Sequence, residues 1–225
     1  MTLLEAIESR HSVRSYTGKP LDGATISALQ QQIDRCNANG RLHIQLVTNE
    51  PQASPCRMAR YGKFSGVTNY IVMAGQRSED LDERVGYYGE HLVLEAQMMG
   101  LNTCWVGLTY SKIPGAFNLA EGEKVVAVIS IGYGSTAGTT HKIKKAGDVS
   151  NVTADSPEWF VNGVKAALLA PTAVNQQKFR FTLEPSGKVA ATARFSLVGY
   201  THVDLGIVKY HFEAASGHKI SNYSL

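Results

Sequence analysis

The chain has 225 residues, of which 44% are hydrophobic and 18% charged, and this composition excludes an intrinsically disordered protein. Its formal net charge of only +3 argues against nucleic acid as a partner. No apolar run approaches the roughly 20 residues that a membrane helix needs, so we expect no membrane partner. The N-terminal residues include Glu5 and Glu8 and lack a basic or long apolar stretch, so we expect no signal peptide.

The cysteines are odd in number and lack the close spacing of zinc ligands or of a redox pair. They are Cys36, Cys56 and Cys104. We therefore expect reduced thiols, no metal site and a cytoplasmic protein.

The first part of the chain mixes helical and extended patterns. The segment Thr2–Glu5 fits a capping box, which predicts a short helix that ends near Ser9. Apolar residues at helical spacing predict a second helix over about 25–36. Alternation predicts a half-buried strand over 41–47, and an apolar run predicts a buried strand over 70–75.

The middle of the chain contains the clearest helical pattern. Apolar residues recur at steps of three and four from Leu81 to Met99, and Gly100 follows where a C-terminal cap belongs. The run 124–132 is almost continuously apolar and rich in β-branched residues. It predicts a central strand that is covered on both faces.

The last third of the chain predicts two more helices and a pair of strands. A helix begins with Ser156 as its cap, has Pro157 as its first residue and continues to the proline at 171. Strands are predicted over 179–184 and, after a turn, over 189–195. A final helix is predicted over about 203–216. Because helices and strands follow one another without a regular βαβ rhythm, the sequence predicts an α+β fold.

Two pairs of glycines have the same separation within helical patterns. They are Gly89 with Gly100 and Gly206 with Gly217. Glycine is common at helix ends, so chance alone explains the equal spacing unless other evidence indicates two related halves.

Four segments carry candidate binding residues. In the first, "SRHSVRSY" (9–16), an extended backbone would point Arg10, Ser12 and Arg14 to one side. Two guanidinium groups and a hydroxyl fit a phosphate, but for so short a cluster taken alone a solvated basic turn is the simpler explanation. In the second, "THKIKKAG" (140–147), the lysines at 142, 144 and 145 follow the central strand and form either a ligand loop or a solvated surface.

The third segment, "GLNTCWVGLTY" (100–110), contains Trp105 and Gly107. A glycine there would let backbone amides approach a planar ligand, whereas a buried strand with a core tryptophan is the simpler interpretation. The fourth, "LLAPTAVNQQKFRFTL" (168–183), places Thr172 and Asn175 after a proline, as short polar groups suited to the edge of a heterocycle. No motif that combines a nucleophile with a general base is evident, so we assign no catalytic residue.

Together these segments resemble motifs of the FMN-dependent nitroreductase family. "SRHSVRSY" is similar to its "RRSxR" motif, "GLNTCWVG" to "GLGTCWIG", and "LLAPTAVNQQKFRF" to "APSAxNxQPWxF". "SIGYGSTAGTTHKIKK" resembles the family strand that leads to a basic pair. The chain departs from the family in that His11 replaces a second arginine, Lys178 replaces the start of "PW", and Gly107 replaces an acid found in one variant.

The late position of "APTAVN" resembles the Thermotoga-type branch, in which two nitroreductase-like halves share one chain. The resemblance therefore implies a central, mostly antiparallel sheet flanked by helices, with a first half over 1–150 and a second, shorter half over 151–225. Such a chain would act as a monomer that is a pseudo-dimer, or as a homodimer.

The resemblance also implies an enzyme with FMN as its cofactor and NAD(P)H as its reductant. Hydride would pass through the flavin to nitro compounds, quinones or similar small molecules. Another flavin enzyme of this fold, of the dehalogenase or enone reductase type, and a non-catalytic FMN-binding protein stay as alternatives. The FMN-binding residues that the resemblance implies are Arg10, His11, Ser12, Arg14, Trp105, Val106, Gly107, Lys142, Lys144, Pro171, Thr172, Ala173 and Asn175.

Overall fold

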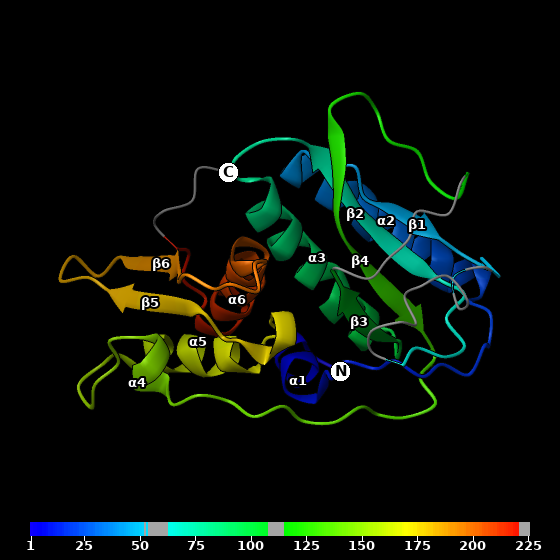
Figure 1. The fold of residues 1–225 in the computed structure, drawn as a ribbon. Coiled ribbons are helices and arrows are strands. Elements are labelled where there is room, and N and C mark those ends of the chain that lie inside the picture. Colours follow the sequence, from blue (N-terminus) through cyan, green and yellow to red (C-terminus); the bar gives the residue numbers. More distant parts are fainter. Residues whose placement is uncertain (52, 54–62, 108–114, 221–225) are drawn as a thin grey trace. The chain divides into compact units, whose positions relative to one another are not determined.

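The computed structural model describes residues 1–51, 53, 63–107 and 115–220. Figure 1 shows a mixed helical and sheet structure, as predicted. In chain order its elements are α1 (Leu3–Ser9), α2 (Gly23–Gly40), β1 (Gln45–Val47), β2 (Tyr70–Gln76), α3 (Leu81–Met98), β3 (Asn102–Val106), β4 (Glu123–Gly132), α4 (Ala146–Val149), α5 (Glu158–Leu169), the 3-10 turn η2 (Ala173–Asn175), β5 (Phe179–Leu183), β6 (Val189–Ala193) and α6 (Thr201–Ser216).

The chain forms two compact units that interleave along the sequence. One, which we call the sheet unit, consists of 10–81 and 91–140, and the other, the α6 unit, consists of 1–9, 82–90 and 141–225. Helix α3 contributes residues to both units. The division of the chain near residue 150 into two related halves stays a prediction.

The sheet unit is built on four strands in the order β1-β2-β4-β3, and every neighbouring pair is antiparallel. This confirms the antiparallel sheet that was expected. Strand β4 lies inside the sheet, and its residues from Val126 onward are buried, because strands on both sides and side chains on both faces cover it. One face contributes to a core that includes Tyr70, Val72, Cys104 and Val128.

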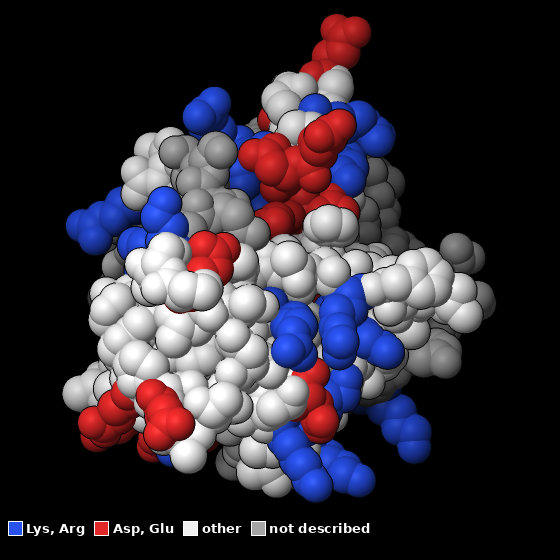
Figure 2. Space-filling view, turned by 90° about the vertical axis from the view of Figure 1, so that its left-hand side faces the viewer, with Lys and Arg blue, Asp and Glu red and all other residues white. Residues whose placement is uncertain are grey.

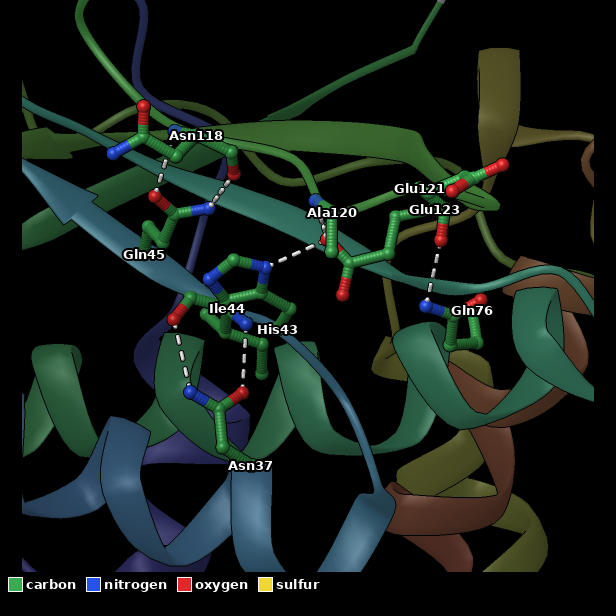
Figure 3. Close-up of polar contacts among 9 residues, drawn as sticks. All are labelled: Asn37, His43, Ile44, Gln45, Gln76, Asn118, Ala120, Glu121 and Glu123. Atoms are coloured by element: carbon green, nitrogen blue, oxygen red, sulfur yellow. Dashed lines mark hydrogen bonds and ion pairs between the residues drawn. The ribbon is translucent and has the colours of Figure 1, made fainter.

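The start of the sheet unit departs from prediction at α2 and β1. Helix α2 begins earlier than expected because Oδ1 of Asp22 accepts a hydrogen bond from the Thr25 N–H at 2.8 Å. It ends at Gly40, where Arg41 adopts a left-handed conformation. The strand predicted over 41–47 is reduced to Gln45–Val47. The Asn37 side chain binds the N–H of Ile44 at 2.7 Å and its C=O at 3.0 Å (Figure 3), so these groups do not join the sheet.

Polar side chains fix the segment that leads into β4 (Figure 3). Gln45 and Asn118 exchange two hydrogen bonds of 2.6 and 3.0 Å. Glu123 accepts from the Ala120 N–H at 2.7 Å and lies 2.7 Å from Nδ1 of His43. Burial raises the pKa of the Glu123 carboxyl, but these two hydrogen bonds outweigh it and hold the pKa below its ordinary value. We regard this cluster as structural, because each of these contacts binds one loop of the unit to its strands.

The α6 unit surrounds a core of phenylalanine rings. Phe212 of α6 stacks on Phe181 of β5 with ring centroids 4.7 Å apart and contacts Phe160 of α5 edge to face. Gly163 allows this packing, because a Cβ there would lie 2.6 Å from a ring carbon of Phe212. In Figure 1 the β5–β6 hairpin lies beside α6. The predicted strands are confirmed, with antiparallel pairing from Phe179 to Leu183.

Helices α3, α5 and α6 confirm their predicted spans to within about two residues. One detail is wrong: Pro157, not Ser156, is the N-cap of α5. The Ser156 hydroxyl instead accepts a hydrogen bond from the Thr153 N–H at 2.9 Å. The predicted capping box of α1 is confirmed, because Thr2 and Glu5 bind each other's backbone N–H.

Acidic and basic side chains pair between the 82–90 segment of α3 and α6. Glu90 and His211 are both fully buried, and Oε1 of Glu90 lies 2.8 Å from Nε2 of His211. Nδ1 of His211 lies 3.1 Å from the carbonyl oxygen of Ala166. Lys209 and Glu83 form a second pair. Among the described residues no helix combines the length and the hydropathy required to cross a membrane.

Candidate functional site

The segment from Arg10 to Arg14 is extended in the sheet unit and runs along the edge of β3. Ser12 bridges to Thr103, and the Val13 N–H donates to the Thr103 carbonyl at 3.0 Å. The Tyr16 hydroxyl donates to the Val13 carbonyl at 2.9 Å. The backbone of this segment is therefore fixed by the sheet and by a buried tyrosine.

The predicted phosphate-binding side chains of this segment lie near one thiol. Burial raises the pKa of Cys104, while the charges of Arg14 and Arg10 and a hydrogen bond with Ser12 act in the opposite direction. The alternation of an extended backbone accounts for this arrangement. Arg10 is only 4% exposed, whereas the Arg14 side chain is exposed.

His11 packs against a glycine of the loop that follows β4. A Cβ on Gly138 would lie 2.7 Å from Cβ of His11 and 3.2 Å from the Ser12 carbonyl oxygen. Gly138 also has a φ of +78°, so both its backbone and its surroundings require glycine. The predicted residues His11 and Ser12 are thus held from a second side within the sheet unit.

The predicted residues Trp105, Val106 and Gly107 lie at the end of β3. Trp105 pairs with Ile129 and Val106 with Val128 of β4. Val106 is buried, but Trp105 and Gly107 are partly exposed. The interpretation of this stretch as a strand is confirmed, whereas the core tryptophan is not observed, since Trp105 retains exposed surface. The rest of that motif, 108–110, lies outside the described residues.

The fourth motif forms a strained loop in the α6 unit, which we call the 172–177 loop. Val174, Asn175 and Gln177 have φ values of +45°, +56° and +46°, a conformation that is rare for residues other than glycine. It is most unfavourable for a β-branched residue such as Val174, and this side chain is 74% exposed. Exposed apolar side chains on strained backbone are typical of binding loops.

The buried side chain of Gln177, 3% exposed, organises the loop from inside. Its Nε2 donates to the Lys142 carbonyl at 2.9 Å and to Oδ1 of Asn175 at 2.7 Å. Its Oε1 accepts from the Lys144 N–H at 2.9 Å. Nδ2 of Asn175 also donates to the Lys142 carbonyl, at 2.8 Å. The second and fourth motifs therefore meet within the α6 unit.

The ammonium group of Lys144 binds the loop as well. Its Nζ donates to the carbonyls of Gln176 and Gln177 at 2.8 and 2.9 Å. Desolvation, with the charges of Lys178 and Arg194, lowers the pKa of Lys144. Lys142 is exposed. Figure 2 shows lysine and arginine side chains in several separate groups, among uncharged residues and groups of aspartate and glutamate.

Asp204 of α6 is a loop contact that the sequence pattern did not suggest. Its Oδ1 accepts from the Ala173 N–H at 2.9 Å, and its Oδ2 accepts from Nε2 of Gln176 at 2.7 Å. Burial raises the pKa of Asp204 to about 6. The available signal was an acid between two apolar residues, Val203 and Leu205, because a buried charge requires partners.

The predicted residues thus fall into two groups. The sheet unit brings together Arg10, His11, Ser12 and Arg14 with β3, and the α6 unit brings together Lys142 and Lys144 with the 172–177 loop. Pro171 precedes that loop and is partly exposed. The part of the chain that the structure describes holds no cluster of three or more His, Cys, Asp or Glu suited to a metal ion.

Comparison with known protein families gives a match to one sequence model over residues 2–216. That model is described as "Putative TM nitroreductase". The chain belongs to this family. The resemblance identified from the four motifs, including its Thermotoga-type branch, is thereby confirmed. A comparison with curated proteins found no match.

Solved structures share the fold of this nitroreductase family member. A "putative nitroreductase" from Thermotoga maritima matches with a TM-score of 0.66 and 21% identity, over 96% of this chain and 83% of that one. A "putative nitroreductase in complex with FMN" from Desulfovibrio desulfuricans has a TM-score of 0.53 and 18% identity, over 70% and 98%. A nitroreductase-like protein from Bacillus cereus has a TM-score of 0.51 and 16% identity, over 66% and 94%. At these identities the similarity establishes the nitroreductase fold.

Proposed function

We propose that this chain binds FMN and acts as an NAD(P)H-dependent oxidoreductase. Its family membership and the FMN complex of the Desulfovibrio relative support a flavin oxidoreductase. The observation that carries the proposal is the arrangement of Arg10, Ser12 and Arg14 on one fixed, extended segment beside β3. FMN has a phosphate, ribityl hydroxyls and a flat heterocycle, and each needs a different kind of partner.

The residues present fit these three parts of FMN. Guanidinium groups bind phosphate through charge-assisted hydrogen bonds, and the Ser12 hydroxyl suits the phosphate or the ribityl chain. Main-chain groups and short polar side chains of the 172–177 loop suit the edge of the heterocycle, and Val174 offers it an apolar contact. Lys142 is exposed and suits the phosphate, whereas the Lys144 ammonium supports the loop.

Bound FMN would supply the chemistry of hydride transfer between NADH or NADPH and a nitro compound, a quinone or a similar acceptor. The chain's own contribution is to bind the phosphate, to hold the ring and to exclude water from it. A cationic or amide group beside the ring would stabilise its reduced, anionic form. We assign no side chain as a proton donor.

We further propose that the chain works in the cytoplasm on a small molecule, either as a monomer with two nitroreductase-like halves or as a homodimer. Sedimentation equilibrium distinguishes these assemblies directly. A monomer that binds one FMN per chain would support the two-half arrangement, and an FMN stoichiometry that requires a dimer would contradict it.

The first test compares the binding of FMN with that of riboflavin, which lacks the phosphate. Quenching of flavin fluorescence gives both affinities for the unmodified chain, for Arg14→Gln and for Arg77→Gln, an exposed arginine elsewhere in the sheet unit. We expect Arg14→Gln to weaken FMN at least ~10-fold, to leave riboflavin unchanged, and to differ from Arg77→Gln. Absence of flavin binding by the unmodified chain would overturn the proposal.

Reduction of the bound flavin then distinguishes an enzyme from a non-catalytic FMN-binding protein. Under anaerobic conditions NADPH or NADH should bleach the bound flavin absorbance, and a nitroaromatic or a quinone should restore it. Flavin that binds but is reduced by neither nucleotide would indicate a non-catalytic FMN-binding protein. Reoxidation by a halogenated phenol or an enone, but not by nitro compounds or quinones, would favour the alternative flavin enzymes of this fold.

A further inference from the structure

Asp204 and Lys144 bind the 172–177 loop through complementary polar groups. Asp204, 2% exposed, receives two donors, the Ala173 N–H and the Gln176 side-chain amide. Lys144 donates to two acceptors, the carbonyls of Gln176 and Gln177. The Asp204 carboxylate therefore accepts hydrogen bonds from N–H groups of the loop, and the Lys144 ammonium group donates to its carbonyl groups.

The hydrogen bonds from Asp204 and Lys144 hold the most strained backbone of the α6 unit. Three of the six loop residues have left-handed φ angles without being glycine. Such backbone persists only where surrounding contacts determine it, and it relaxes when they are removed. Asp204 contacts Ala173, the first residue of the η2 turn, and Gln176, which follows the last residue of that turn. Its two hydrogen bonds therefore lie on either side of Val174 and Asn175 in the chain.

The orientation of the Gln176 amide depends on the same carboxylate. Its Nε2 donates both to Asp204 and to the Gly199 carbonyl, at 2.7 and 3.0 Å. Among the described residues its buried Oε1 has no hydrogen-bond partner. Because two acceptors hold Nε2, the amide is fixed in one orientation, which leaves Oε1 as an unused acceptor within the loop.

We propose that Asp204 is a positioning residue for flavin binding, which holds the 172–177 loop in the conformation that receives the isoalloxazine ring. This inference rests on the proposed function, since it concerns the ring side of the same cofactor. Asp204 acts through Ala173 and Gln176 and does not itself touch the flavin. The carboxylate lies in the first turn of α6, where it also favours the helix dipole, so the test must separate loop positioning from helix stability.

The test uses Asp204→Asn, which keeps the shape of the side chain but loses one acceptor. Its matched control is Glu158→Gln, the same chemical change at an exposed acid in the first turn of α5. Hydrogen exchange of the flavin-free proteins is followed in peptides that cover 171–177 and in peptides of α6. We expect Asp204→Asn to raise exchange at the Ala173 amide about 10-fold and to leave α6 unchanged. Glu158→Gln should change neither.

The second readout is flavin affinity. Asp204→Asn should weaken FMN and riboflavin equally, by about 10-fold, because the loop is proposed to receive the ring that both share. Arg14→Gln should weaken FMN alone, so the two sites have different signatures. Faster exchange throughout α6 would show a structural role for Asp204 and overturn the proposal. Faster exchange in the loop with unchanged flavin affinity would overturn it as well.

The outcomes for Asp204 and for the proposed function are distinguishable. If the unmodified chain binds no flavin, the proposed function fails together with the positioning role, whatever the exchange data show. If the unmodified chain binds flavin and Asp204→Asn binds it equally well, only the role of Asp204 fails. Weaker binding of both flavins, with exchange raised only in the loop, supports it.

Discussion

Gly86 of α3 and Gly206 of α6 contact each other's helix backbone in the same way. A Cβ on Gly86 would lie 2.0 Å from the carbonyl oxygen of Val203, which is three residues before Gly206. A Cβ on Gly206 would lie 2.0 Å from the carbonyl oxygen of Glu83, three residues before Gly86. Such reciprocity, in which residue i contacts j and j contacts i, is the signature of a local two-fold relationship.

This contact changes which residues of the two helices correspond. The equal spacing of Gly89–Gly100 and Gly206–Gly217 pairs Gly89 with Gly206, whereas the structure pairs Gly86 with Gly206. The glycine spacing and the helix contact therefore pair Gly206 with different residues of α3. The reciprocal contact supports the proposal of two related halves, because two-fold helix crossings are usual where two copies of one fold meet.

We predict that Gly206→Ala strongly destabilises the protein. The added methyl group would overlap a backbone carbonyl, which cannot move aside as a side chain can, so we expect a loss of about 3 kcal/mol or more in the free energy of unfolding. Urea denaturation measures this loss. Gly23→Ala, in the first turn of α2 with nothing within 4 Å of the new methyl, should be nearly neutral. Equal stability of the two variants would contradict the close approach of these helices.

The elements with a strong apolar period could be predicted from the sequence, whereas those decided by one side chain could not. Helix α3 and strand β4 have long, uninterrupted patterns, and their ends were predicted to within a residue or two. The 41–47 stretch alternates equally well, yet the Asn37 side chain takes both backbone groups of Ile44. Local hydrogen bonding of this kind competes with the sheet and leaves no trace in hydrophobic periodicity.

For the candidate site, the sequence indicated the motifs but not how they are supported. The sequence shows the two arginines, Arg10 and Arg14, and the alternation of side chains along an extended backbone predicts that they point to the same side. The hydrogen bonds of Lys144 and Asp204 to the 172–177 loop join residues about 30 positions apart. Only the folded chain brings these groups together, so the contact of Lys144 with the loop could not be predicted from the sequence, and its role in phosphate binding stays a prediction.

We predict that Lys144→Met destabilises the flavin-free protein and that Lys142→Met does not. Loss of the Lys144 ammonium leaves the carbonyls of Gln176 and Gln177 without their donor, which should lower the free energy of unfolding by about 1–3 kcal/mol. Lys142 presents an exposed side chain, so its loss should change stability by less than about 0.5 kcal/mol. If thermal or urea unfolding gives the same stability for both variants, the ammonium of Lys144 does not support the loop.

We predict strong coupling between Glu90 and His211. Either Glu90→Leu or His211→Leu would remove the 2.8 Å hydrogen bond that joins the two buried side chains, which should cost about 3–5 kcal/mol. The double variant should be destabilised by clearly less than the sum of the two, as a double-mutant cycle in urea would show. Lys219→Met removes a lysine that is 81% exposed from its ion pair with Glu213. Glu213 keeps hydrogen bonds from the Tyr87 hydroxyl and the Ile220 N–H, so the loss should be at most about 1 kcal/mol. Additive effects at Glu90 and His211 would rule out the coupling.

The last prediction concerns the pH dependence of stability that Asp204 produces. Burial raises the pKa of Asp204 from its ordinary value of 3.8 to about 6 in the folded chain, so between these values the folded state binds the extra proton. The stabilisation from this group is therefore complete below about pH 4 and is lost as the pH rises through about 6. Relative to Asp204→Asn, the free energy of unfolding of the unmodified chain should fall by about 2 kcal/mol from pH 4 to pH 7. The comparison cancels the titration of groups that both proteins share, and a difference that stays constant or grows with pH would show that the carboxylate is well solvated or better paired than the structure indicates.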